Sequence, residues 1–267
     1  MATNLMLNLT ALLALVPASI ASFRRAPHGP DLVFWAVLAA ALAGPLAFGL
    51  SRVGSTWQTD LSTALWISIA VSLAIFAGLA ALTRAAWRLA PLLLPYLLLL
   101  ALLATVWSNV PGSESVGQSQ SSWLAVHIAV SVVTYALATL AAVSGAAVFL
   151  QEMALKRKWT SSLPRLLPAI ADGERLELRL LAAAETVLGI GIVSGMALQY
   201  FAAGQVFAFD HKTLLSLTAF AVIGALLIWR QVTGLRGRRA ARLVLLAYLL
   251  LTLAYPGVKF VSDVLIG

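Results

Sequence analysis

Residues 61–83 read LSTALWISIAVSLAIFAGLAALT, a stretch without a single charged side chain. An α-helix rises about 1.5 Å per residue, so this stretch is long enough to cross a hydrocarbon layer of about 30 Å. Backbone amides inside a bilayer find no water and must pair within the chain. The stretch also lacks the alternation of polar and apolar residues that indicates a barrel strand. It therefore predicts a membrane-spanning helix.

Apolar runs of this kind recur along the whole chain of 267 residues, of which 61% are apolar and 10% charged. Soluble domains carry about 25% charged residues, so the composition argues strongly against a water-soluble fold. We predict an all-α bundle of about eight transmembrane helices, formed by residues 1–267 as a single integral membrane domain. The predicted spans are Leu5–Ser22, Leu32–Leu50, Leu61–Thr83, Leu89–Trp107, Trp123–Leu150, Leu180–Phe201, Thr213–Trp229 and Leu243–Val261.

Lysine and arginine are distributed unevenly among the connections between these spans. The connections after the first, third, fifth and seventh spans hold 15 of the 18 basic residues, and the opposite side holds only Arg52, Lys212 and Lys259. Cytoplasmic loops are enriched in these residues, so we predict that the basic side is cytoplasmic and that both termini are periplasmic. Attraction of these basic residues to anionic lipid head groups then explains the net charge of +8, and we expect no nucleic-acid partner.

The connection from Gln151 to Arg179 is the longest on the basic side, and Pro164 and Pro168 interrupt it. We expect its second part to lie on the membrane surface. The chain contains no cysteine and none of the H-E-x-x-H, G-x-S-x-G or P-loop motifs, which excludes thiol chemistry and argues against an enzyme.

Histidines near the outer ends of the spans are the main candidates for a binding site. His127 begins the fifth span and His211 directly precedes the seventh, so both are predicted at similar depth near the outer face. Ser131 and Thr134 follow His127 at helical spacing and are expected to face the bundle. A buried histidine that only makes interhelical hydrogen bonds is the alternative to a metal ligand.

The connection between the sixth and seventh spans carries Phe207, Phe209, Asp210, His211 and Lys212 within a few residues. A haem site needs flat apolar surface, an imidazole for the iron, and a cation for the propionates, and this connection offers all three. The alternative is an interfacial aromatic belt in which Asp210 caps the following helix.

At these residues the sequence resembles the cytochrome c assembly superfamily of haem-handling membrane proteins, which includes the CcsA, CcmC and HemX types, and it is most similar to the YpjD type. The resemblance covers residues 123–261. It is carried by five pieces. The first three are the histidine-led span His127–Tyr135, the pair Ser194-Gly195, and the loop of residues 203–213, which stands at the place of W-G-x-x-W-x-W-D-x-K-E. The other two are the basic turn Gly234–Arg239 and the last span, Ala254–Phe260.

The loop departs from the family pattern at several positions. Ala203, Phe207 and Phe209 stand at the three tryptophan positions, whereas Gly204, Asp210 and Lys212 match by identity. His211 stands where the family has proline and Thr213 where it has glutamate, and residues 262–267 lack the second histidine of the haem-presenting members.

The resemblance implies a non-enzymatic protein of the bacterial inner membrane that binds or positions haem near the periplasmic face. It implies His127 as an axial ligand, His211 as a second ligand, Phe207 and Phe209 as the platform, and Lys212 beside the matched Asp210 as a propionate partner. Proteins of cytochrome c maturation or haem biosynthesis are the implied partners.

Two other functions are compatible with the sequence. A HemX-like regulator or scaffold of haem biosynthesis would not bind haem and would bind a soluble partner through residues 156–179. A small-molecule transporter would use Glu185, an acidic residue inside the sixth span.

Overall fold

The computed structural model describes residues 2–24, 29–53, 60–83, 85–108, 122–159, 161–204, 211–234 and 236–261. All regular structure in these ranges is helical, which confirms the all-α prediction. The elements are α1 (Ala2–Arg24), α2 (Leu32–Val53), α3 (Leu61–Leu82), the 3-10 helix η1 (Ala86–Leu89), α4 (Ala90–Val106), α5 (Ser122–Arg157), α6 (Leu163–Leu166), α7 (Ile170–Ala203), α8 (His211–Thr233), α9 (Arg238–Thr252), the π-helix η2 (Leu253–Gly257) and α10 (Val258–Phe260).

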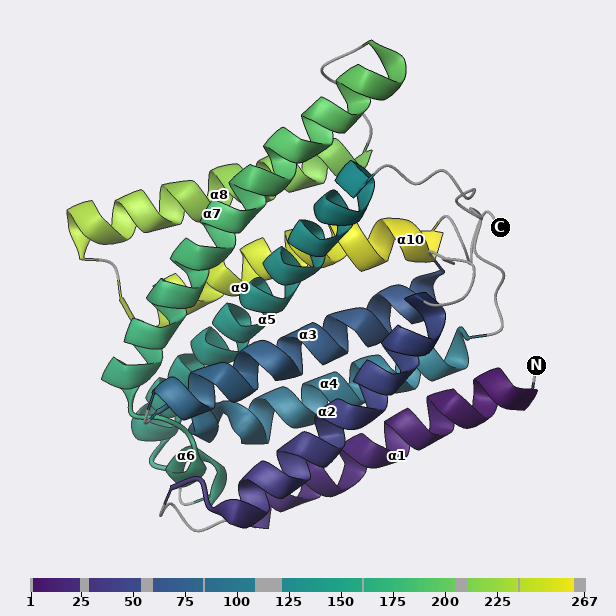
Figure 1. The fold of residues 1–267 in the computed structure, drawn as a ribbon. Helices are drawn as coiled ribbons and strands as arrows, with labels where there is room; N and C mark the ends of the chain where they lie inside the picture. The colour runs from purple at the N-terminus through teal and green to yellow at the C-terminus, as the bar shows by residue number, and fades with distance from the viewer. Residues whose placement is uncertain are drawn as a thin grey trace.

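Eight helices of the described ranges are long and apolar enough to cross a membrane, and each corresponds to one predicted span. The chain is therefore a multi-pass membrane protein. Figure 1 shows α1 to α4 as one half of the bundle and α5, α7, α8 and α9 as the other. Helix α5 joins the halves, because it packs against α3 on one side and against α7 and α9 on the other.

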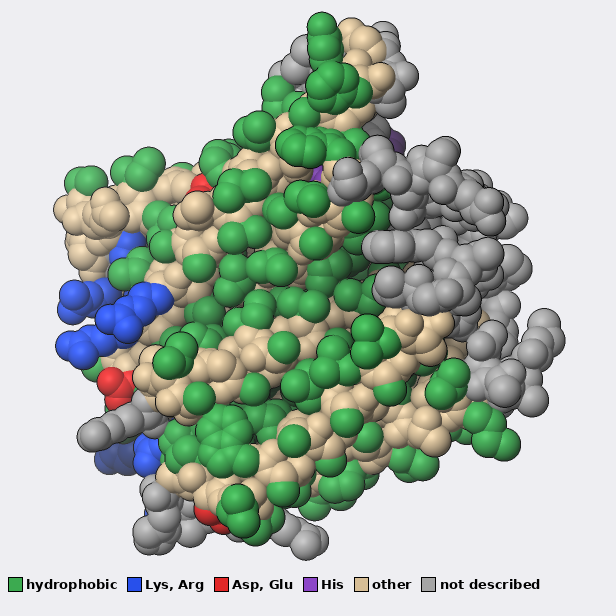
Figure 2. All heavy atoms as spheres, viewed as in Figure 1, with side chains coloured by type: hydrophobic (Ala, Val, Ile, Leu, Met, Phe, Trp, Pro, Cys, Tyr) green, Lys and Arg blue, Asp and Glu red, His purple; other side chains and the backbone are tan. Residues whose placement is uncertain are grey.

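The start of α1 and the last helix, α10, lie at the same end of the bundle (Figure 1). The Lys and Arg side chains visible in Figure 2 gather at the opposite end. This arrangement agrees with an even number of spans and with basic connections on one side. That the basic end faces the cytoplasm remains a prediction of the positive-inside rule.

Helices α5 and α7 are longer than their predicted spans, with 36 and 34 residues. Residues 170–179, for which we expected a separate segment on the membrane surface, instead continue into the sixth span as one helix. The structure gives the physical reason. Glu177 pairs with Arg230 through a 2.9 Å contact, and the Glu174 carboxylate accepts a hydrogen bond from the Gly237 N–H. Two of the acids of this segment, Glu174 and Glu177, thus find partners on neighbouring helices.

Three tyrosines from three helices meet inside the bundle. Tyr96 of α4 and Tyr248 of α9 share a short hydrogen bond, and Tyr248 also lies 3.1 Å from the Tyr135 hydroxyl of α5. The Thr139 hydroxyl lies 3.1 Å from that of Tyr248. Polar groups in an apolar bundle are stable only when they pair with one another. The tyrosine cluster, defined as Tyr96, Tyr135 and Tyr248, therefore links both halves of the fold.

We predict that Tyr248→Phe lowers the free energy of unfolding by about 1–3 kcal/mol, because the change keeps the ring stacking but removes the buried hydroxyl that Tyr96, Tyr135 and Thr139 all contact. The measurement is denaturant unfolding of the detergent-solubilised protein. Tyr200→Phe is the matched control, because Tyr200 is 55% exposed and its hydroxyl lies outside the cluster. Equal stability of the two variants would contradict the structural role of the cluster.

Candidate functional site

His127 lies in the second turn of α5, at the end of the bundle opposite the basic residues. Its Nδ1 lies 2.8 Å from the Oγ of Ser194 on α7. Ser194 is buried, with only 6% of its surface exposed. The structure therefore brings together the histidine and the Ser-Gly pair that the resemblance singled out, although they are 67 residues apart in the chain.

The hydrogen bonds of Ser194 favour one protonation pattern for His127. A serine hydroxyl has one hydrogen, and the Gly191 carbonyl lies 2.9 Å from the Ser194 oxygen, in position to accept it. In that arrangement the serine oxygen accepts a hydrogen bond from His127, with the proton on Nδ1. In the neutral imidazole, Nε2 carries the lone pair, and a lone pair is what a metal ligand needs.

The α7 backbone also restricts the imidazole sterically. A Cβ atom at Gly195 would lie 3.0 Å from Cε1 of His127, which is closer than side chains tolerate without shifting. Glycine at this position thus lets the ring lie directly on α7. The Trp123 indole, one turn before His127, donates to the Ser194 carbonyl at 3.4 Å and adds a second bond between the two helices.

The polar residues that follow His127 pair within their own helix. Ser131 donates to the His127 carbonyl and Thr134 to the Val130 carbonyl, both at 2.9 Å. Thr134 is buried, as expected for a side chain that faces the bundle. These hydroxyl groups are satisfied without a ligand, so they do not extend the site around His127.

The other predicted site residues are placed only in part. His211 is the first residue of α8 and is exposed. Phe207, Phe209 and Asp210 lie outside the described residues, as does the side chain of Lys212. Within the described ranges no group of three or more His, Cys, Asp or Glu side chains is arranged to hold a metal ion. The roles of these five residues stay predictions.

Glycine at position 204 has a structural reason. It ends α7 with a positive φ of 66°, and its N–H donates to the Tyr200 carbonyl. Glycine adopts this left-handed conformation without steric cost and commonly ends helices. This residue, one of the three family identities in the loop, thus sets where the chain leaves α7 toward the predicted platform.

Sequence reasoning missed two polar groupings inside the bundle. One is the tyrosine cluster; the other is the buried ion pair of Glu177 with Arg230, which we had counted among the basic connections. Polar side chains are rare in apolar spans, and this rarity could have marked both groupings in the sequence. Glu185, the transporter candidate, has a buried Oε2 without a hydrogen-bond partner among the described residues, and its Oε1 lies against Gly224 of α8.

We predict that His127 is present as the Nδ1-protonated tautomer and that Ser194→Ala removes this preference. Nitrogen-15 NMR of histidine-labelled protein distinguishes the two ring nitrogens, and His127→Gln identifies the signal. Ser131→Ala is the control, because this serine bonds only to its own helix backbone. A wild-type protein with the proton on Nε2 would contradict the assignment.

Comparison with known proteins assigns the chain to a family. A family model described as "Cytochrome C assembly protein" matches residues 32–266, so the match extends well beyond the residues that carry the resemblance in the sequence. A protein of Azospirillum brasilense described as "Uncharacterized 28.8 kDa protein in nifR3-like 5'region" is 53% identical over 271 residues, which cover 100% of both chains. No solved structure matches. With all spans but the first inside the match, this multi-pass membrane protein belongs to the cytochrome c assembly protein family.

Proposed function

We propose that this protein binds or positions haem near the periplasmic face of the bacterial inner membrane and acts in cytochrome c biogenesis. Membership of the cytochrome c assembly family supports a haem-related role in that process. The observation that carries the finer proposal is the contact of His127 Nδ1 with Ser194 Oγ, which orients the imidazole; with the proton on Nδ1, Nε2 is the nitrogen that would bind iron.

The residues around His127 fit one face of a haem. Imidazole is a common axial ligand of haem iron, and metal-binding histidines characteristically donate their other ring N–H to a neighbouring acceptor. The side chains that flank the site are apolar and outward-facing: Val126 is 50% exposed and Val193 is 67% exposed. Beyond them the last turns of α7 project past the neighbouring helices (Figure 1) and expose Phe201 by 82%.

Each residue has a defined part in the proposal. Bound haem supplies an iron and two propionates; Nε2 of His127 is the iron ligand, and Ser194 and Gly195 hold the ring. His211 is the proposed second ligand. Phe207 and Phe209 form the platform, and Lys212 beside Asp210 meets the propionates. Binding and presentation require no covalent step by this chain, so we propose a carrier and not an enzyme.

We predict that the protein, purified after expression with abundant haem, shows a Soret band that disappears in His127→Ala and weakens in His211→Ala. Ser194→Ala should lower haem affinity roughly 10- to 100-fold, as loss of a residue that orients a ligand commonly does. Ser131→Ala is again the control and should bind haem like the wild type. Absorption titration of the apoprotein with haem gives the affinities.

A colourless wild-type protein would overturn the proposal and favour the HemX-like regulator instead. In that case a crosslinking probe in residues 156–159 or 161–179 should capture a soluble partner, and the phenotype should be indifferent to both histidines. Flux of a small molecule that Glu185→Gln abolishes would favour the transporter.

A further inference from the structure

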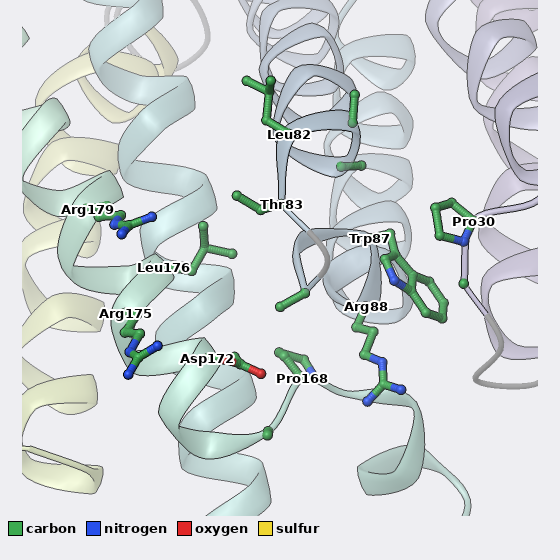
Figure 3. A pocket seen from close by; sticks show the side chains of 15 residues that line it. Pro30, Leu82, Thr83, Trp87, Arg88, Pro168, Asp172, Arg175, Leu176 and Arg179 are labelled. Atoms are coloured by element: carbon green, nitrogen blue, oxygen red, sulfur yellow. The ribbon is translucent and has the colours of Figure 1, made fainter.

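A cavity of about 1000 Å³ opens between the two halves of the bundle, at the basic end. Its walls come from the ends of α3 and η1 on one side and from the start of α7 on the other (Figure 3). Sites for small molecules commonly measure about 300–1,000 Å³. The space is therefore large enough for a ligand, and it lies far from His127, at the other end of α7.

The charged lining of the cavity is strongly basic. Arg175 and Arg179 are four residues apart on α7 and share one face of the helix, and Arg88 stands across from them on η1 (Figure 3). Asp172 is the one acidic side chain among the described lining residues. The three guanidinium groups make no ion pair with a carboxylate of the described residues, in contrast to Arg230, which Glu177 neutralises.

The wall toward the membrane is apolar. Leu82, the last residue of α3, is 84% exposed, whereas Leu176 and Trp87 line the same cavity but are only 6% and 9% exposed. The candidate span that ends at Leu82 is followed within six residues by Arg88, whose guanidinium lies 5.5 Å from the centre of the Trp87 ring. This change from apolar to aromatic and basic residues is typical of the edge of a bilayer.

An anionic phospholipid matches both the basic and the apolar parts of this lining. Arginine binds phosphate through two parallel hydrogen bonds; Arg88 is half-buried, and Arg175 and Arg179 are exposed and therefore accessible to a head group. The α7 helix also begins at the cavity, with Pro168 and Ala169 in the wall, so the partial positive charge of its N-terminus adds to that of the arginines. A free phosphate would leave the exposed side chain of Leu82 uncovered, whereas an acyl chain would cover it.

We propose that the cavity binds one anionic phospholipid, with the phosphate held by Arg88, Arg175 and Arg179 and the acyl chains along Leu82. Basic pockets between transmembrane helices on the cytoplasmic side commonly bind anionic lipid head groups. The site does not depend on haem. A lipid bound there would lie between the two halves of the bundle.

Native mass spectrometry in a neutral detergent tests the proposal, because without a bilayer only lipid held at a site remains bound. With equal amounts of phosphatidylglycerol and phosphatidylethanolamine present, the wild type should retain phosphatidylglycerol. The double variant Arg175→Gln/Arg179→Gln should bind it roughly 30-fold less tightly, because each arginine lost removes the attraction that one basic residue near a membrane surface has for an anionic lipid. Asp172→Asn removes the opposing charge and should increase retention.

The matched control is Arg157→Gln/Arg239→Gln, which removes two exposed charges at the same end but outside the cavity and should bind lipid like the wild type. Equal loss in both double variants would overturn the proposal, and so would equal retention of the two lipids. Displacement of phosphatidylglycerol by inorganic phosphate would show an anion site without a lipid and would also contradict it. If the arginine double variant does not fold, unchanged retention in Asp172→Asn overturns the proposal.

Discussion

The close approach of α5 to α7 is the packing on which the rest of the structure depends. A Cβ at Gly173 would lie 2.8 Å from Val148, and one at Gly191 would lie 3.4 Å from Val130. The two glycines are 18 residues apart on α7 and the two valines are 18 residues apart on α5, which is five full turns of each helix. Small residues in this register let the two backbones approach, and in lipid such close packing replaces the hydrophobic effect as the source of association. The glycine at 195 belongs to the same interface and positions His127.

Within this frame, polar side chains hold the bundle together by pairing with one another. The tyrosine cluster joins helices of both halves. The bond from the Trp66 indole to Asn8, 2.6 Å long, ties α3 to α1. The Glu177 carboxylate, 1% exposed, forms an ion pair with the Arg230 guanidinium. Removal of one partner from such a pair leaves a buried charge or donor without compensation, which costs far more than the pair contributes. These contacts therefore specify which helices meet.

Helix α7 runs between the two proposed sites. Near its C-terminal end Ser194 and Gly195 hold the imidazole of the proposed haem site, and near its start Arg175 and Arg179 line the proposed lipid site. A rigid helix of 34 residues keeps these two regions at a constant separation. A lipid between the halves would thus support the helix that also positions His127.

Composition and apolar run lengths alone determined that the chain is an all-α membrane protein with eight spans, because a bilayer leaves the backbone no other way to pair its amides. The sequence also pointed to His127, from its place at the outer end of a span, and to Ser194-Gly195, through the resemblance to the family. Only the tertiary structure decided that the serine faces the histidine, that Glu177 meets Arg230, and that Arg88 stands across the cavity from Arg175. These are contacts between helices distant in sequence. Hydropathy records how deep a residue lies in the membrane, but it does not record which neighbour it faces.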